Sequence, residues 1–171
     1  MNFSQDAIVK DLVLVGGGHS HVIALRKFGM KRLPGVRLTV IARDVHTPYS
    51  GMLPGYVAGH YEYDEAHIDL RPLCQFAGAR LYHDEATFLD LKTKLVVCAE
   101  RPAVPYDVLS INIGSTPSFS NVPGAKEFTT PVKPINNFID RGNGWSNVCW
   151  TAPARIELVL SVLARAVQSC S

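Results

Sequence analysis

The chain has 171 residues, of which 47% are hydrophobic and 19% charged, and its formal net charge is +2. This composition is typical of one globular domain that buries its own core, and Lys and Arg never form the basic runs of nucleic-acid-binding proteins. No apolar stretch is long enough to span a bilayer, and residues 1–10 lack the features of a signal peptide, so we expect an intracellular, cytoplasmic protein.

The cysteines and histidines show no metal-ligand spacing. No two cysteines form a C-x-x-C pair, so we expect reduced thiols that pack in the interior. The six histidines are scattered, and His19 and His21 stand two residues apart at a helix start, where they cannot share a face. We therefore expect neither a metal site nor a dithiol redox centre. The cysteines are Cys74, Cys98, Cys149 and Cys170.

Residues 11–28 predict a strand, a tight turn and a helix. Residues 12–15 are an apolar run that fits a buried strand, and three consecutive glycines follow it. Apolar side chains then recur at helical spacing. These are Val22, Ile23, Leu25 and Phe28.

The glycine turn at residues 16–18 suits a dinucleotide. Without a Cβ atom at Gly16 and Gly18 the turn can be sharp and a pyrophosphate can approach the backbone, while the helix start attracts its charge. The spacing is G-x-G-x-x-H, because His21 takes the place of the third glycine, whose usual role is close packing of helix and strand. The alternative is a Gly-rich turn that binds nothing.

Residues 37–42 predict a second strand, parallel to the first through the usual right-handed crossover. A dinucleotide fold normally has an acidic residue at the end of this strand, which accepts hydrogen bonds from the adenosine ribose. Here Ala42 and Arg43 come first and Asp44 follows. Asp44 either contacts the ribose from a shifted position or caps the next turn.

Residues 47–59, "TPYSGMLPGYVAG", are dense in glycine and proline and predict a loop. Its apolar surface indicates that it folds against something, either a flat aromatic ligand or the core. The apolar residues are Tyr49, Met52, Leu53 and Tyr56.

The middle of the chain predicts shorter elements. We expect a short helix over residues 70–76 with a stop at Gly78, a strand near residues 80–83, and a hairpin either side of residues 92–94. Residues 108–113 predict a buried strand.

The last strand and the tail complete the prediction. Residues 114–117 end the strand with a turn at the carboxyl edge of the sheet, where ligands of such folds sit. Near the end of the chain, Thr151 is the expected N-cap of an apolar-striped helix over residues 153–168, which we expect to fold back on the domain or to mediate self-association.

Three ordered motifs carry a family resemblance: "VLVGGGHSHV" at 13–22, "VHTPYSGMLPGYVAGHY" at 45–61 and "YDVLSINIGSTP" at 106–117. Together they resemble the flavin-binding half of the pyridine nucleotide flavoprotein oxidoreductases, which include type II NADH dehydrogenases. "GGGHSHV" with "PYSGMLPG" is similar to the NADH dehydrogenase-like branch that is fused to, or encoded beside, selenophosphate synthetase (selenide, water dikinase). The resemblance covers residues 12–138.

The resemblance implies an α/β fold, a Rossmann-like FAD-binding domain with a parallel central sheet, a small β-hairpin excursion and a C-terminal helix. It implies an FAD-binding domain over residues 1–140 and a divergent tail over residues 141–171. FAD would lie with its pyrophosphate at the glycine turn, its adenosine near the second strand, its flavin ring at the middle motif and a second contact after the last strand. In that order the implied residues are Gly16, Gly17, Gly18, His19 and Ser20; Arg43 and Asp44; Ser50, Gly51, Met52 and Leu53; Gly114 and Ser115.

The implied activity is flavin-dependent oxidoreduction, in which NAD(P)H reduces the flavin and an unidentified small molecule accepts the electrons. No catalytic side chain is implied, because the chemistry belongs to the cofactor. Family members carry a second βαβ unit for NAD(P)H after a segment like residues 131–140, whereas here Ala152, Pro153 and Ala154 stand where glycines are expected. We therefore expect a truncated member. The alternatives are a non-catalytic flavin-binding or interaction fragment and an NAD-binding dehydrogenase domain, which would carry an acid at position 42.

Overall fold

The computed structural model describes residues 7–114, 123–124 and 135. The chain divides into two units, residues 1–114 and 115–171, and the helices and strands given below belong to the first. Ser115, Thr151, Cys149, Cys170 and the tail helix expected over residues 153–168 lie outside the described residues. The division at residue 140 remains a prediction.

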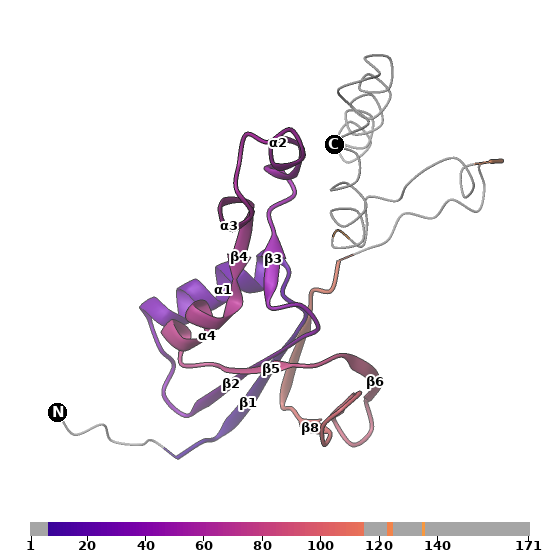
Figure 1. Cartoon of the computed structure of the whole chain (residues 1–171). Helices are drawn as coiled ribbons and strands as arrows, with labels where there is room; N and C mark the ends of the chain where they lie inside the picture. Colours follow the sequence, from indigo (N-terminus) through magenta and orange to yellow (C-terminus); the bar gives the residue numbers. More distant parts are fainter. Residues whose placement is uncertain (1–6, 115–122, 125–134, 136–171) are drawn as a thin grey trace. The chain divides into compact units, whose positions relative to one another are not determined.

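A parallel sheet forms the centre of the first unit (Figure 1). Its order is β5 (Arg80–His83), β2 (Val36–Ala42), β1 (Lys10–Val15) and β9 (Val108–Ile111). All neighbouring strands are parallel, with Val15 opposite both Ile41 and Ile111. The α/β prediction is confirmed. In such sheets ligands bind at the carboxyl edge where the strand order reverses, which here is between β1 and β9.

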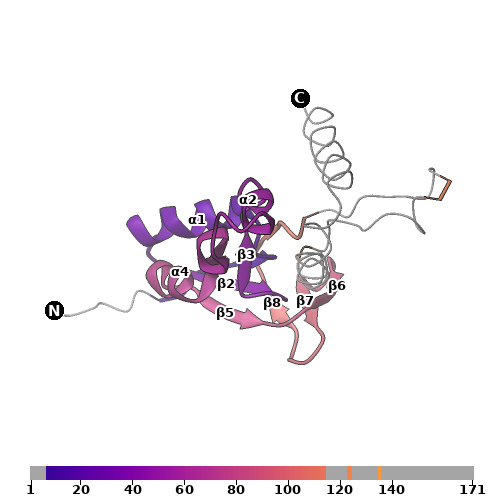
Figure 2. The ribbon, with the colours of Figure 1, turned by 45° about the horizontal axis from the view of Figure 1, so that its top comes forward.

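Two layers cover the sheet, because its strands alternate apolar side chains between the two faces. The helices α1 (His19–Met30) and α4 (Leu70–Ala77) pack on one face, and the small sheet β6–β8 covers the other (Figure 2). The helix-side core consists of Leu14, Leu25, Leu38, Val40, Ala42, Leu70, Cys74 and Ala77. The opposite core consists of Val13, Val15, Ile41, Val96 and Cys98.

The helix α4 confirms the prediction for residues 70–78. The Asp69 side chain caps its start by accepting a hydrogen bond from the Arg71 amide, and Gly78 ends it at a φ of +67°, in the left-handed region that glycine tolerates best. None of the helices in the described part of the chain is long and apolar enough to cross a membrane.

The predicted hairpin is also present. The strand β6 (Ala86–Asp90) pairs antiparallel with β7 (Leu95–Cys98), and β8 (Val104–Pro105) joins β7 on its other side. Asp84 anchors this small sheet, since its carboxylate accepts hydrogen bonds from the Glu85 and Glu100 amides and from the Arg101 guanidinium. Burial opposes ionisation of Asp84, but these hydrogen bonds outweigh it, and the pKa of Asp84 is lowered.

The prediction of a plain loop over residues 47–59 is wrong. This segment begins in β3 (His46–Pro48), which pairs antiparallel with β4 (His67–Asp69), and it contains α2 (Leu53–Val57). A second short helix, α3 (Tyr63–Ala66), follows. The prolines do not prevent this, because Pro54 lies in the first turn of α2, where no helical partner for its missing N–H is lost.

One burial prediction, that of a buried strand over residues 108–113, is also wrong. The last strand ends at Ile111, and both Val108 and Ile111 are about half exposed, at 54% and 52%. The reason is that β9 lies at the edge of the sheet as described, with β1 on one side. On α1, Ile23 is 56% exposed, whereas His21 is buried.

Candidate functional site

The glycine turn lies between β1 and α1, at the carboxyl edge of the sheet. Gly16 has a φ of +94°, and a Cβ atom there would lie 2.3 Å from the Asn112 carbonyl oxygen just beyond β9. Its amide donates to the Ile41 carbonyl, 2.8 Å away. Only glycine meets both the conformational and the steric requirement at this position.

Gly18 is required for a different reason. Its φ of −62° is ordinary, so the backbone conformation does not by itself require glycine there. A Cβ atom at Gly18 would lie 2.3 Å from the Asn112 side chain, and one at Gly17 would lie 2.7 Å from both Leu70 and Thr47. In the directions in which these Cβ atoms would point, protein side chains rather than a pyrophosphate occupy the space.

The carbonyl groups of the turn all have hydrogen-bond donors. The Gly16 carbonyl lies 2.7 Å from His21 Nδ1, and the Gly17 carbonyl accepts from the Thr47 hydroxyl at 2.6 Å. The Gly18 carbonyl accepts from the amides of His21 and Val22. No carbonyl oxygen of the turn is left to repel an anion.

The amide groups of the turn are paired differently. The Gly18 amide donates to the Asn112 carbonyl at 3.1 Å, whereas the amides of Gly17, His19 and Ser20 have no acceptor among the described residues. Unpaired N–H groups at the start of a 12-residue helix favour an anion, and the first turn of α1 contains no acidic residue that would oppose one.

His21 joins the turn to the last strand. Its side chain is buried, with Nδ1 beside the Gly16 carbonyl and Nε2 2.9 Å from the Ser110 hydroxyl oxygen of β9. A carbonyl oxygen can only accept, so Nδ1 carries a proton, and in the neutral ring Nε2 accepts from Ser110. The close packing expected of the third glycine is thus replaced by hydrogen bonds from an imidazole.

His19 faces the excursion between β2 and α4. Its ring lies against Tyr49, with the ring centroids 5.2 Å apart, and its Nε2 atom is buried without a hydrogen-bond partner in the part of the chain that the structure describes. A buried polar atom without a partner is costly, so a ligand atom at this position would stabilise the site.

Three other aromatic rings of the excursion pack on one another. Tyr63 stacks on the ring of His67 at 3.9 Å, and Tyr56 meets both rings edge-on. His67 Nδ1 lies 2.8 Å from the Tyr63 carbonyl, and His67 Nε2, like that of His19, is buried without a partner among the described residues. Packing within the excursion therefore accounts for Tyr56, while Tyr49 stays next to the glycine turn.

Among the described residues, no hydrogen bond or ion pair joins the other predicted site residues to the glycine turn. Arg43 and Asp44 follow β2 and pair with each other at 3.2 Å. Ser50 and Gly51 are exposed and Met52 is half-buried, whereas Leu53 is buried in the excursion. Gly114 has a φ of +79°, and a Cβ atom there would meet no described residue within 4 Å apart from its chain neighbours.

The sequence did not indicate three residues that contact the glycine turn or His21: Thr47, Ser110 and Asn112. The sequence predicts a loop at Thr47, and nothing in its sequence context shows that its hydroxyl reaches residue 17. Position 21 offered a signal, because a histidine replaces a motif glycine there. In the described residues, no three His, Cys, Asp or Glu side chains gather in a way that could hold a metal ion.

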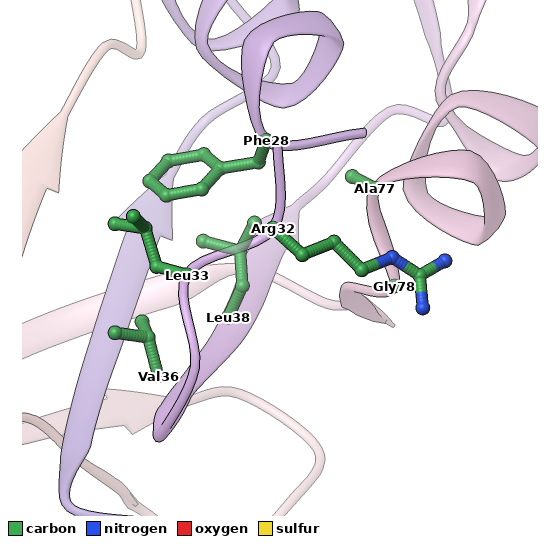
Figure 3. Close-up of a pocket in the computed structure, with 7 residues that line it drawn as sticks. All are labelled: Phe28, Arg32, Leu33, Val36, Leu38, Ala77 and Gly78. Carbon is green, nitrogen blue, oxygen red and sulfur yellow. The ribbon is translucent and has the colours of Figure 1, made fainter. Parts of the chain in front are cut away.

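A small pocket of about 210 Å³ lies at the opposite, amino-terminal edge of the sheet (Figure 3). Arg32 spans it and donates to the Phe76 carbonyl at 3.3 Å, next to Gly78, so its charge meets the negative end of the α4 dipole. The hydrogen bond to Phe76 and the helix dipole give Arg32 a structural role. The pocket does not include any residue of the glycine turn. Its lining residues are Phe28, Arg32, Leu33, Val36, Leu38, Ala77 and Gly78.

No protein-family model matches the chain. Over 133 residues the chain is 29% identical to the NADH dehydrogenase-like protein YutJ of Bacillus subtilis, a match that covers 75% of this chain and 36% of that protein.

Solved structures share the fold. The sulfide:quinone oxidoreductase of Aquifex aeolicus matches 85% of this chain with a TM-score of 0.69 and 18% identity, over 33% of its own length. The water-forming NADH oxidase of Lactobacillus brevis, solved with NADH, matches 70% with a TM-score of 0.58 and 19% identity, over 28% of its length. The chain therefore has the Rossmann-like fold of these oxidoreductases and spans about a third of the length of the relatives it matches.

The two kinds of glycine in the turn can be separated by mutation. Gly16→Ala is expected to lower the free energy of unfolding by at least about 1–3 kcal/mol. The alanine would have to adopt a positive φ, and its Cβ atom would clash with the backbone. Gly18→Ala should also destabilise the protein, but Asn112→Ala in the same chain should restore most of that loss by removing the clashing side chain. The same second substitution should not rescue Gly16→Ala. Chemical denaturation of the single and double variants measures this, and equal rescue at both positions would contradict the assignment.

Proposed function

We propose that this chain is the flavin-binding portion of an FAD-dependent NAD(P)H oxidoreductase of the NADH dehydrogenase-like kind. The observation that carries the proposal is the glycine turn at the point of strand-order reversal, with its carbonyl groups paired and three amides available to an anion. The similarity to an NADH dehydrogenase-like protein over 133 residues supports it.

The residues present fit FAD. The amides of Gly17, His19 and Ser20 would hold the pyrophosphate, and Arg43 with Asp44 would lie near the adenosine. Residues 50–53 would lie near the flavin ring, with Gly114 and Ser115 as the second contact. Bound FAD would supply the redox chemistry, which is hydride acceptance from NAD(P)H and electron transfer to an acceptor, and the protein would supply binding and orientation.

The narrower relationship to the branch associated with selenophosphate synthetase is part of the proposal. It is supported by "GGGHSHV" and "PYSGMLPG", which supply His21 and the turn before α2. Self-association through residues 153–168 also remains a prediction.

A second candidate is a non-catalytic flavin-binding module. The observation in its favour is that residues 140–171 contain only Gly142 and Gly144 as glycines, with no apolar strand before them, so they lack a second dinucleotide turn. The two candidates share the FAD site and differ in whether nicotinamide can reduce the flavin.

We expect the purified 171-residue chain to retain or bind FAD. The measurement is the absorption spectrum of the protein, followed by mass analysis of the ligand released on denaturation. FAD is the expected ligand. Release of NAD with no flavin, or failure to bind added FAD, would contradict the proposed function.

We further expect the FAD-loaded 171-residue chain to react poorly with NADH. Holding the nicotinamide against the flavin accounts for roughly 7–11 kcal/mol of such a barrier, and the grip of a second glycine turn is missing. The measurement is anaerobic mixing with NADH while flavin bleaching is followed. Saturable reduction at about 1 per second or faster would show that residues 140–171 contain a nicotinamide site after all.

A further inference from the structure

We propose that His21 and Thr47 are positioning residues, which hold the Gly16 and Gly17 carbonyl groups away from a bound pyrophosphate, and that His21 thereby also directs the Gly17 amide toward it. The inference rests on the proposed function and extends it to residues that do not themselves touch the ligand. It also assigns a role to the histidine that departs from the glycine motif.

The argument begins with the peptide unit between Gly16 and Gly17. In a trans peptide the carbonyl and the N–H point in opposite directions. Because His21 Nδ1 holds the Gly16 carbonyl at 2.7 Å, the Gly17 amide must point the other way, and it has no acceptor among the described residues. Flanking glycines leave this peptide unit free to turn over, and a reversed unit would present a carbonyl oxygen to the anion.

Thr47 acts on the next peptide unit. Its hydroxyl donates to the Gly17 carbonyl at 2.6 Å, while the Gly18 amide of the same unit donates to the Asn112 carbonyl. This unit is therefore held at both ends, with its oxygen directed toward β3. Thr47 is buried, so its hydroxyl hydrogen bond is shielded from competing water.

His21 therefore gives this turn two hydrogen bonds that a glycine could not make. A glycine at position 21 would restore the familiar spacing, but it would leave the Gly16 carbonyl and the Ser110 hydroxyl without this partner. We expect that His21→Gly weakens pyrophosphate binding even though it completes the G-x-G-x-x-G motif.

The two nitrogens of His21 can be tested separately. In His21→Asn the amide nitrogen takes roughly the position of Nδ1, which preserves the hydrogen bond to Gly16, whereas in His21→Gln it reaches toward Ser110 instead. Ser110→Ala removes the second hydrogen bond and leaves the first in place. For Thr47, serine retains the hydroxyl and valine removes it with little change of shape.

The experiment is titration calorimetry of the full chain with FAD and, separately, with inorganic pyrophosphate, alongside the unfolding midpoint of each ligand-free variant. His21→Gln and Thr47→Val are expected to raise the Kd for both ligands by about tenfold, the effect of one lost hydrogen bond. His21→Asn, Thr47→Ser and Ser110→Ala should stay within about threefold of the parent chain. A purely structural role would instead make Kd follow the unfolding midpoint, with Ser110→Ala as weak a binder as His21→Gln.

Each outcome bears on one claim or the other. If the parent chain binds pyrophosphate but not FAD and the variants keep this order, the positioning roles stand and the proposed function fails. If FAD binds and the Kd values of His21→Gln and Thr47→Val are unchanged, the positioning roles are wrong while the proposed function stands. If the parent chain binds neither ligand, both are overturned.

Discussion

The site depends on the contact between the turn after β1 and the residues that follow β9. Gly16 approaches the Asn112 backbone too closely for any side chain, and the Gly18 amide donates to the Asn112 carbonyl. These contacts join the ends of β1 and β9 at the point where the strand order of the sheet reverses, which is where a ligand of such a fold binds. The same contacts determine which backbone groups of the turn remain available.

The excursion between β2 and α4 supplies the other side of the site. Pairing of β3 with β4 places Thr47 against the Gly17 carbonyl, and Tyr49 follows directly beside the ring of His19. Within the excursion, the ring of Tyr63 stacks on the ring of His67. The excursion is thus built from its own local packing, and it contributes to the glycine turn through two residues.

Local patterns were sufficient to predict the framework. Each correct prediction used only residues that are close together in the sequence. Examples are the apolar run before Gly16, the strand at residues 37–42 and the helix end at Gly78. The roles of Thr47 and Asn112 could not be predicted, because both depend on contacts between distant parts of the chain. Thr47 contacts Gly17, 30 residues away, and Asn112 contacts Gly18, 94 residues away. For the same reason the need for glycine at position 18 was assigned to a ligand, although a neighbouring side chain accounts for it.

The central claim is that the pyrophosphate of FAD lies on the amides of Gly17, His19 and Ser20. A crystal structure of the chain grown with FAD tests this most directly. The account predicts pyrophosphate oxygens at about 3 Å from these three nitrogens, with the Gly16 carbonyl still bonded to His21. A flavin dinucleotide bound elsewhere, or a turn in which the Gly16 carbonyl faces the phosphate, would contradict it.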